Sequence, residues 1–557
     1  MGSMHERASC FGRGLVPFRE WKKRLHDHDD VLVMEPLSDL LTSPKPQPVR
    51  LLAADLQGIE ARLVEIQASV FGAESSPPRI LGLPDAAVRE AYHRVRTAFQ
   101  AQDFTMPRGQ IVVNLAPARS RKAGSAFDLG IAMALAAVGG YVPPGKLSDI
   151  LFVGELDLDG RLRPVPGTIA RVELARRMAI PFLLCPIQSA ALAHRASQGS
   201  PFILPAEDLD RALRIAREGP DACPPIPDLP DSSQSSFPVY PDLGRVRGQE
   251  SARRALFLAA AGAHNLLLSG PPGCGKSLLA SCLPGLLPLL THQERLEVLK
   301  IQGSFDASAE ERAAEALELG RVPFRAPHHT ISHAGLVGGG VPPHPGEISL
   351  AHRGVLFLDE LPEFKRGALE TLRQPLEHGL VHIRRAKESH LFPASFQLIA
   401  AMNPCPCGLL GHPKLPCRCT GKEIQRYRSR ISAPLLDRID LQLSLQPVPA
   451  EEFLELRPNE KPQSPALRDR VTQLRSIQHE RNSGVLNSGL AEESLRHMLA
   501  DRARRALLAE CRGGRLSARA ITRVLRLART IADDDEATDI GEVHLAQALQ
   551  LRHRLEP

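Results

Sequence analysis

The sequence is poor in aromatic residues, in long apolar runs and in net charge. Aromatic residues make up 4% of the 557 residues, with a single Trp, which argues against a single-strand-binding module that stacks bases on rings. No apolar run reaches the roughly 18 residues of a membrane span, and no secretory signal is recognisable, so we expect a cytoplasmic protein without membrane contact. The 69 basic and 63 acidic residues leave a net charge of +6, so any nucleic-acid site must be a local patch.

The length of the chain predicts several folding units. Single cores seldom grow beyond roughly 250 to 300 residues, so two or three domains are expected. The stretch from Cys223 onward is rich in Pro and Ser, which interrupt helices and strands, and predicts a linker. Met1-Gly2-Ser3-Met4 resembles a cloning remnant ahead of a second start. The expected units are a poorly structured extension (1–47), an α/β domain (48–220), the linker (221–242), an α/β core (243–447) and a helical region (448–557).

Apolar periodicity predicts the main elements. Strands are expected at Gln110–Leu115, Asp149–Val153, His264–Ser269, Val355–Leu358 and Phe396–Met402. Helices are expected at Ile169–Met178, Leu209–Arg217 and Ala518–Ala532, and a helix should end near Ala261. These patterns indicate mixed α/β structure followed by helices.

Residues 270–277 match the phosphate-binding loop pattern at every fixed position, between an expected strand and an expected helix. Backbone N–H groups of such a loop point at phosphate oxygens at the start of the helix. Lys276 adds a positive charge there, and Ser277 offers a hydroxyl to Mg²⁺. The sequence therefore predicts an ATPase, with nucleotide-binding residues Gly270, Pro271, Pro272, Gly273, Cys274, Gly275, Lys276 and Ser277.

Two polar strand ends are expected to complete the nucleotide site. The apolar run from Val355 ends in Asp359 and Glu360, which are suited to hold Mg²⁺ and to polarise the attacking water, respectively. The alternative is an acidic strand end that caps the next helix. Asn403 ends the next apolar run, and its amide is expected to orient the same water, although Asn-Pro is also an ordinary turn.

Four cysteines crowd into one short segment, as two closely spaced pairs across a loop. Cys405, Cys407, Cys417 and Cys419 can supply the four thiolates of a tetrahedral Zn²⁺ site, with His412 as a substitute ligand. A single residue between the members of a pair is tighter than usual, and reduced thiols in a proline-stiffened loop are the alternative.

A second cluster of metal-ligating side chains is a weaker candidate. His328, His329 and His333 lie in a Gly- and Pro-rich stretch whose spacing prepares no tetrahedral site. A mobile element that ATP turnover moves is the better expectation for this stretch.

At this point the sequence resembles a known family, the ComM/YifB proteins, which are AAA+ ATPases related to magnesium-chelatase subunit I. The resemblance covers about Val49 to Arg554. Its distinctive words are Gly82-Leu-Pro-Asp-Ala-Ala-Val88, Val113-Asn-Leu-Ala-Pro-Ala118, Gly154-Glu-Leu156, Pro323-Phe-Arg-Ala-Pro-His-His329, Gly346-Glu-Ile-Ser-Leu-Ala-His352, Leu435-Leu-Asp-Arg-Ile-Asp440 and Leu516-Ser-Ala-Arg519. The resemblance implies an α/β fold, with an AAA+ P-loop core and a C-terminal helical lid, preceded by a Lon-protease-type α/β domain.

The resemblance also implies a function. Such proteins form rings, usually hexamers, and ComM-like members are implicated as DNA helicases that drive branch migration in natural transformation. The expected partners are therefore single-stranded and branched DNA, other copies of this chain and recombination proteins. Two alternatives remain open, a chelatase-type ATPase that drives metal insertion and a Lon-like peptidase or scaffold.

Further site residues follow from the resemblance alone. Arg438 matches the arginine finger that acts on the neighbouring subunit's nucleotide, although a surface salt bridge with Asp437 or Asp440 is the alternative. Arg519 matches the sensor arginine of the lid, or belongs to a solvated basic face. Residues 377–393 look like the pre-sensor hairpin. In a ring this hairpin would bring the DNA-binding residues Arg384, Arg385 and Lys387 to the pore, unless it is an ordinary solvated hairpin.

The Lon-like region lacks the residues that proteolysis needs. A serine activated by a lysine is the required pair. Ala126 falls at the serine position and Ile169 near the lysine position, while Ser125 is one residue away. We therefore expect a non-catalytic domain. The basic run from Arg119 to Lys122 is expected to touch DNA or to lie in solvent.

Overall fold

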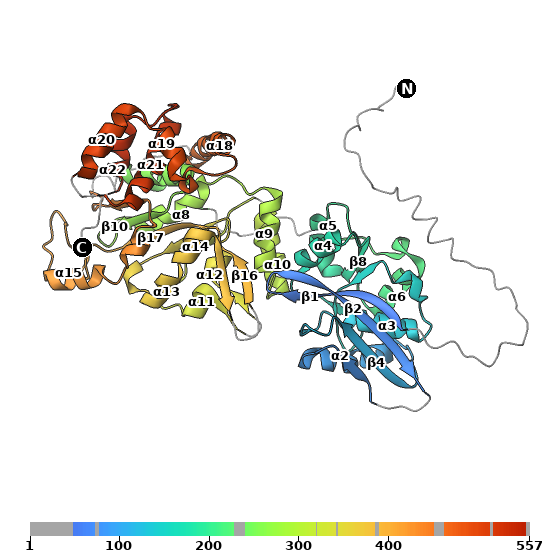
Figure 1. Ribbon diagram of the computed structural model, residues 1–557. Helices are drawn as coiled ribbons and strands as arrows, with labels where there is room; N and C mark the ends of the chain where they lie inside the picture. Colours follow the sequence, from blue (N-terminus) through green and yellow to red (C-terminus); the bar gives the residue numbers. More distant parts are fainter. Residues whose placement is uncertain are drawn as a thin grey trace, which may run out of the picture.

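The computed structural model describes residues 48–72, 77–227, 240–318, 320–340, 343–384, 389–449, 462–512 and 516–552. The predicted extension over 1–47 and most of the predicted linker lie outside these residues. The structure has a mixed α/β front part, a five-stranded sheet with its helices, and a helical C-terminal part (Figure 1). Among the described residues, no helix combines the length and apolar composition that crossing a membrane requires.

The front part is built on a seven-stranded mixed sheet. In spatial order its strands are β3 (Arg79–Leu81), β4 (Gln110–Ala116), β2 (Glu60–Phe71), β1 (Val49–Gln57), β5 (Ile150–Phe152), β8 (Phe182–Pro186) and β9 (Phe202–Ala206). The antiparallel strands β1, β2 and β4 adjoin a parallel half that begins with β5. The helices are α2 (Ala86–Ala101), α3 (Asp128–Val138), α4 (Thr168–Arg177), α5 (Ile187–Ser197) and α6 (Leu209–Glu218), with a small hairpin of β6 (Glu155–Leu156) and β7 (Leu162–Arg163).

The second sheet has five strands, all parallel. Its spatial order is β11 (Phe324–Arg325), β14 (Val355–Leu358), β17 (Gln397–Met402), β10 (Leu266–Ser269) and β18 (Leu441–Ser444). The three central strands are buried along their whole length, as expected of a parallel sheet covered on both faces. Because β10, β14 and β17 run in the same direction, the residues that follow them meet at one edge of the sheet.

Helices surround this sheet, and two small hairpins extend from it. The helices are α7 (Glu250–Gly262), α8 (Lys276–Leu286), α9 (His292–Gln302), α10 (Ala307–Glu318), α11 (His333–Val337), α12 (Glu347–Leu350), α13 (Arg366–Thr371), α14 (Arg373–His378), α15 (Gly421–Arg428) and α16 (Ala433–Leu436). The hairpins are β12 (Gly338–Gly339) with β13 (His344–Pro345), and β15 (Leu380–Arg384) with β16 (Ser389–Pro393). The C-terminal helices are α18 (Ser464–Arg481), α19 (Glu492–His497), α20 (Asp501–Arg512), α21 (Ala518–Asp534) and α22 (Glu542–Gln550).

The α9–α10 pair joins the front part to the five-stranded sheet (Figure 1). The buried Glu310 carboxylate of α10 accepts hydrogen bonds from the N–H groups of Thr168 and Ile169, each at 3.0 Å, at the start of α4. A carboxylate suits this place because the first N–H groups of a helix lack partners within the helix. Lys300 of α9 adds ion pairs to Glu60 and Glu173, at 2.7 and 2.6 Å.

Candidate functional site

Three neighbouring strands bring the predicted nucleotide residues to the carboxyl edge of the five-stranded sheet. β10 leads into Gly270, β14 into Asp359 and β17 into Asn403. The N–H of Gly270 donates to the Met402 carbonyl at 3.2 Å, so the start of the loop is fixed to the neighbouring strand. The strand order thus gathers residues that are as much as 133 positions apart in sequence around one point.

The Lys276 side chain is buried beneath the phosphate-type loop. Its Nζ donates to the carbonyl oxygens of Gly270 and Pro271, at 2.8 and 2.9 Å, and to the Asn403 side-chain oxygen at 3.2 Å. Gly273 and Gly275 have φ values of +79° and +89°, and a Cβ added to either would meet nothing within 4 Å. The loop therefore has the backbone that only glycine adopts easily, around open space that suits phosphate groups.

The residues expected to hold Mg²⁺ and to polarise the attacking water lie beside this loop. Ser277 Oγ donates to Asp359 Oδ2 at 2.8 Å, so the hydroxyl and the carboxylate expected to hold Mg²⁺ are in contact. Glu360 has a left-handed backbone, with φ of +51°, and its side chain is half exposed. His329 Nδ1 lies 3.1 Å from Glu360 Oε2, and the His329 ring packs edge-on to Phe364. The oxygen donors fit a hard divalent cation.

Arg438 lies at the opposite, amino edge of the same sheet. The Asn265 residue that precedes β10 bonds to the Arg438 carbonyl at 3.1 Å, and its N–H donates to Asp440 at 3.0 Å. The phosphate-type loop begins only after the four residues of β10, each of which advances about 3.3 Å. The length of β10 therefore separates Arg438 from the loop of its own chain.

Arginine residues gather around Arg438 in a pocket of about 180 Å³. Its lining residues are Glu377, Asp437, Arg438, Arg519, Thr522, Arg523 and Arg526. Arg438 and Arg519 are thus brought together, although 81 positions separate them. Arg523 pairs with the fully buried Asp440 at 2.9 Å, whereas Arg519 is exposed. We call this group of residues the arginine pocket.

The carboxylate that pairs with Arg438 belongs to neither Asp437 nor Asp440, the alternatives that proximity in sequence suggested. The Arg438 guanidinium pairs with Glu377 and donates to the Pro434 carbonyl, and the residue is only 6% exposed. Asp440 is engaged by Arg523 instead. Burial raises the pKa of Asp440. The neighbouring His264 imidazole and the charge of Arg523 outweigh this effect of burial and lower the pKa to about 2.

The four cysteine thiols converge on one point, with all sulfur atoms within 4.8 Å of one another. Cys405 Sγ lies 3.4 Å from Cys407 Sγ and 3.6 Å from Cys417 Sγ. His412 Nδ1 accepts the N–H groups of Lys414 and Leu415, so this nitrogen serves its own loop. The arrangement has the donor set of a structural Zn²⁺ site.

The cysteine loop also touches the nucleotide site. A Cβ added to Gly408 would lie 2.7 Å from the Pro272 ring, so the loop approaches the phosphate-type loop as closely as glycine allows. Cys405 follows Asn403 by two residues. Cross-linking of this loop by a metal would therefore stiffen the backbone beside Pro272 and Asn403.

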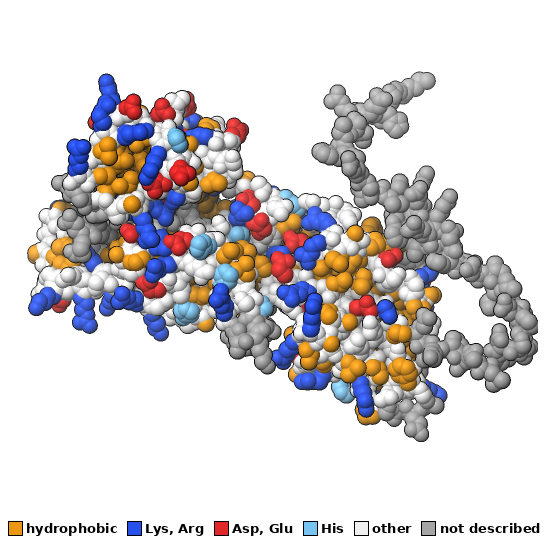
Figure 2. All heavy atoms as spheres, in the orientation of Figure 1, with side chains coloured by type: hydrophobic (Ala, Val, Ile, Leu, Met, Phe, Trp, Pro, Cys, Tyr) orange, Lys and Arg blue, Asp and Glu red, His pale blue; other side chains and the backbone are white. Residues whose placement is uncertain are grey.

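The candidate DNA-binding hairpin is formed by β15 and β16, paired from Leu380 with Pro393 to Arg384 with Ser389. Arg384 is exposed, whereas Arg385 and Lys387 lie outside the described residues. Figure 2 shows further Lys and Arg side chains along the lower left edge, around the α15 region of Figure 1. Exposed basic residues of that region are Lys414, Arg418, Lys422, Arg426 and Arg430. Sequence reasoning missed this cluster because net charge conceals a local patch.

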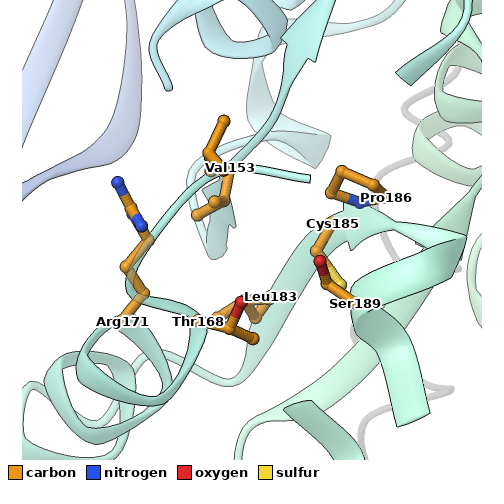
Figure 3. A pocket seen from close by; sticks show the side chains of 8 residues that line it. Val153, Thr168, Arg171, Leu183, Cys185, Pro186 and Ser189 are labelled. Atoms are coloured by element: carbon orange, nitrogen blue, oxygen red, sulfur yellow. The ribbon is translucent and has the colours of Figure 1, made fainter. Parts of the chain in front are cut away.

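The front part has no serine–lysine pair at the positions that a Lon-type peptidase uses. Ala126 and Ile169 are both buried in the core. The neighbouring Ser125 hydroxyl donates to the Glu155 carboxylate. Beside α4, a small pocket is lined mainly by apolar side chains with Thr168, Arg171 and Ser189 (Figure 3). The hydroxyl next to the expected serine position, that of Ser125, is therefore paired with a carboxylate.

Two features of the predicted surfaces differ from expectation. Lys122, expected in a DNA-facing or solvated run, is fully buried and donates to the Ser120 carbonyl at 2.8 Å. That expectation was wrong for Lys122 because the backbone carbonyls of Pro117 and Ser120 satisfy the ammonium inside the fold. His329, weighed as a metal ligand and as part of a mobile element, contacts Glu360.

Three family models match successive parts of the chain. The model described as magnesium chelatase, subunit ChlI, matches residues 242–453. That described as subunit ChlI of Mg-chelatase matches 66–189, and the model of the subunit ChlI C-terminal region matches 461–552. The matches follow the front part, the five-stranded sheet with its helices, and the C-terminal helices.

Two relatives match nearly full length. YifB of Escherichia coli (strain K12) is 39% identical over 480 residues, which cover 85% of this chain and 91% of the relative. The competence protein ComM of Haemophilus influenzae is 38% identical over 499 residues, covering 89% and 95%. A Lon protease homologue of Thermoplasma acidophilum matches 69 residues at 38% identity, or 12% of this chain and 14% of that protein.

Proposed function

Because the chain belongs to the magnesium-chelatase-like AAA+ family of YifB and ComM, we propose that it is a ring-forming ATPase that moves DNA. The family itself indicates an ATPase. Our finer proposal is a branch-migration helicase that supports recombination during natural transformation, in the cytoplasm and alongside recombination proteins. The printed name of ComM, a competence protein, motivates the link to transformation.

One observation carries the proposal: the residues suited to nucleotide chemistry are divided between opposite edges of one sheet. Lys276, Asp359 and Asn403 lie at the carboxyl edge, and Arg438 lies at the amino edge. A guanidinium that cannot reach the phosphates of its own chain can serve those of a second copy. Heterologous contacts of this kind close into rings, and we propose a homo-hexamer.

At the carboxyl edge we assign the nucleotide-binding and catalytic roles. Residues 270–277 would hold the phosphates of ATP, with Lys276 moving from the loop carbonyls to phosphate oxygens. Ser277 and Asp359 would hold Mg²⁺, which supplies charge neutralisation at the transferred phosphoryl group. Glu360 would accept a proton from the attacking water and Asn403 would orient that water.

At the amino edge we assign Arg438 as the finger that stabilises charge on the neighbour's γ-phosphate. Guanidinium groups suit this role because they present several donors in a fixed plane. Arg519, in the same pocket, would act on the same phosphates. The pocket contains more arginine than carboxylate residues, which favours an anionic ligand.

We propose that DNA contacts come from the β15–β16 hairpin, through Arg384 and, outside the described residues, Arg385 and Lys387. Six copies of such a hairpin would form a basic collar around the channel of a ring. The exposed basic residues near α15 extend the positive surface. Binding through phosphates would be insensitive to sequence, as a branch-migration motor requires.

We also propose that Cys405, Cys407, Cys417 and Cys419 hold a structural Zn²⁺ ion. The convergence of four sulfur atoms supports this assignment over isolated reduced thiols. Bound to all four thiolates, Zn²⁺ would have no open position for chemistry. Its role would be to fix the loop that packs on Pro272.

The decisive experiment is ATP-dependent branch migration of a synthetic Holliday junction by the full chain. The wild type should convert the junction to duplex products, and Lys276→Ala and Glu360→Gln should not. A verified hexamer that leaves the junction intact, and whose ATPase rate DNA does not change, contradicts the motor. Metal insertion into a porphyrin by the same preparation would then favour the chelatase-type alternative.

A further inference from the structure

The finger arginine is held back in this structure by a carboxylate. Arg438 is 6% exposed, and its guanidinium is paired with Glu377 and with the Pro434 carbonyl. Its Nε is buried without a hydrogen-bond partner among the described residues. To reach a phosphate outside its own subunit, Arg438 must leave Glu377, so whatever moves Glu377 controls the finger.

Glu377 lies at the base of the hairpin that is our candidate DNA contact. It stands in the last turn of α14, and β15 begins three residues later at Leu380. Between them Gly379 adopts a left-handed backbone with φ of +65°. The Gly379 carbonyl accepts the N–H of Ala394 at 2.7 Å, which closes the base of the hairpin. Only His378 and Gly379 therefore separate Glu377 from the first strand of the hairpin, and a backbone hydrogen bond closes this junction.

The ion pair joins two elements that are 61 positions apart in sequence. Arg438 follows α16, whose carbonyls at Pro434 and Leu436 bond to Arg438 and Gln442. The Glu377 side chain remains 44% exposed while that of Arg438 is 7% exposed. The carboxylate can thus turn into solvent at little cost, whereas the guanidinium needs another anion to replace it.

We propose that Glu377 is a positioning residue that restrains Arg438 until the β15–β16 hairpin engages DNA. Hairpin movement withdraws Glu377, Arg438 turns outward, and its charge becomes available to the nucleotide of the neighbouring subunit. This inference rests on the proposed function, because it assumes that the hairpin meets DNA and that Arg438 acts on a neighbour. It makes one side chain the link between DNA contact and hydrolysis.

The test compares steady-state ATPase rates of the full chain with and without single-stranded DNA, for the wild type and Glu377→Gln. The amide keeps the shape but removes the charge that holds Arg438. The DNA-free rate should rise about fivefold, the population change that loss of one partly exposed ion pair produces. The KM for ATP should stay unchanged, and the ratio of the rates with and without DNA should fall towards one.

Two further variants separate restraint from a merely structural role. Glu377→Gln combined with Arg438→Ala should lose the extra DNA-free activity, because the gain acts through the finger. Glu492→Gln removes an exposed Glu–Arg pair on α19 and should leave both rates unchanged. A folded Glu377→Gln protein whose DNA-free rate equals that of the wild type overturns the proposal, and so does a gain that survives loss of Arg438.

Failure of the proposed function would look different. If DNA does not stimulate the wild type but Glu377→Gln still raises its DNA-free rate through Arg438, the restraint stands and the DNA trigger is wrong. If Glu377→Gln lowers the melting temperature and both rates together, the pair is structural. If the pair is structural, Glu377→Asp, which keeps the charge on a shorter side chain, should restore neither rate. If Glu377 is a restraint, the same variant should recover part of the stimulation by DNA seen in the wild type.

Discussion

The carboxyl and amino edges of the five-stranded sheet differ in how their functional residues are held. At the carboxyl edge Lys276 bonds to Asn403, and Ser277 bonds to Asp359, within a single chain. At the amino edge Arg438 and Arg519 line the arginine pocket. The anionic groups among its lining residues are the carboxylates of Glu377 and Asp437. The first edge is connected within one chain, whereas under our proposal the second edge meets the phosphates of a neighbouring subunit.

The strongest way to break the comparison is to mix two inactive variants. Lys276→Ala and Arg438→Ala should each lower ATP hydrolysis by about a thousandfold, the worth of a nucleotide lysine or an arginine finger. An equimolar mixture should recover activity, because about a quarter of random interfaces pair an intact loop with an intact finger. ATPase rates of co-assembled subunits measure this directly.

The matched control for mixing uses two residues of the same edge. Lys276→Ala mixed with Glu360→Gln should stay inactive, because no chain in the mixture has both Lys276 and Glu360 intact. Recovery in this control would mean that Lys276 and Glu360 act across subunits. No recovery with Arg438→Ala despite proven co-assembly would place Arg438 in its own subunit's site. Arg438 would then reach the loop of its own chain in spite of the length of β10 between them.

A smaller effect is expected for the second arginine of the pocket. Arg519→Ala should slow hydrolysis by roughly tenfold, because one donor to the developing charge is lost while Arg438 remains. Nucleotide binding by dilute, separated subunits should not change, which a fluorescent ATP analogue can measure. Arg505→Ala, another exposed arginine of the C-terminal helices, serves as control. Weakened binding to separated subunits would assign Arg519 to its own chain's nucleotide.

The cysteine quartet should affect the carboxyl edge more weakly still. Cys405→Ser and Cys417→Ser should each abolish a zinc content of one ion per chain, measured by metal analysis. Because Gly408 packs on Pro272, loss of the metal should lower nucleotide affinity several-fold without preventing hydrolysis at saturating ATP. Cys511→Ser, outside the quartet, should change neither quantity. Zinc-free wild-type protein with full affinity would favour reduced thiols.

The carboxyl edge was largely predictable from sequence because its motifs are local. The loop at 270–277 and the apolar strands ending at Asp359 and Asn403 carry their own signals, and the expected strands and helices match observed ones within one or two residues, such as Thr168–Arg177 and Ala518–Asp534. The family assignment is also confirmed. The roles given to individual residues remain predictions.

The amino edge was much less predictable. Proximity in sequence favoured Asp437 or Asp440 as the partner of Arg438, but the chain brings Glu377 there from 61 positions away. Glu310 likewise reaches Thr168 across 142 positions. An ion pair between distant elements leaves no periodic pattern, since either residue alone reads as an ordinary surface charge. Only the strand order and the packing of the helices reveal such pairs.

Asp440→Asn should have the smallest effect on hydrolysis at neutral pH. The stability of this variant is the most specific test of the amino edge. The pKa of Asp440 in the folded protein is about 2, below the ordinary value of 3.8, so the ionised carboxylate stabilises the fold at any pH above about 4. That stabilisation, about 2 kcal/mol for a shift of this size, is lost as the pH falls from 4 towards 2. Asp440→Asn should therefore unfold more easily in urea at pH 7.

The difference in stability between Asp440→Asn and the wild type should shrink as the pH is lowered, because protonation removes the same charge from the wild type. Urea unfolding at several pH values above 3 measures this convergence. Asp469→Asn, at an exposed aspartate of α18, serves as the control. A constant difference would mean that Asp440 acts by shape and hydrogen bonding rather than by charge. Arg523 would then need no carboxylate beside it, and the arginine pocket would be held by packing alone.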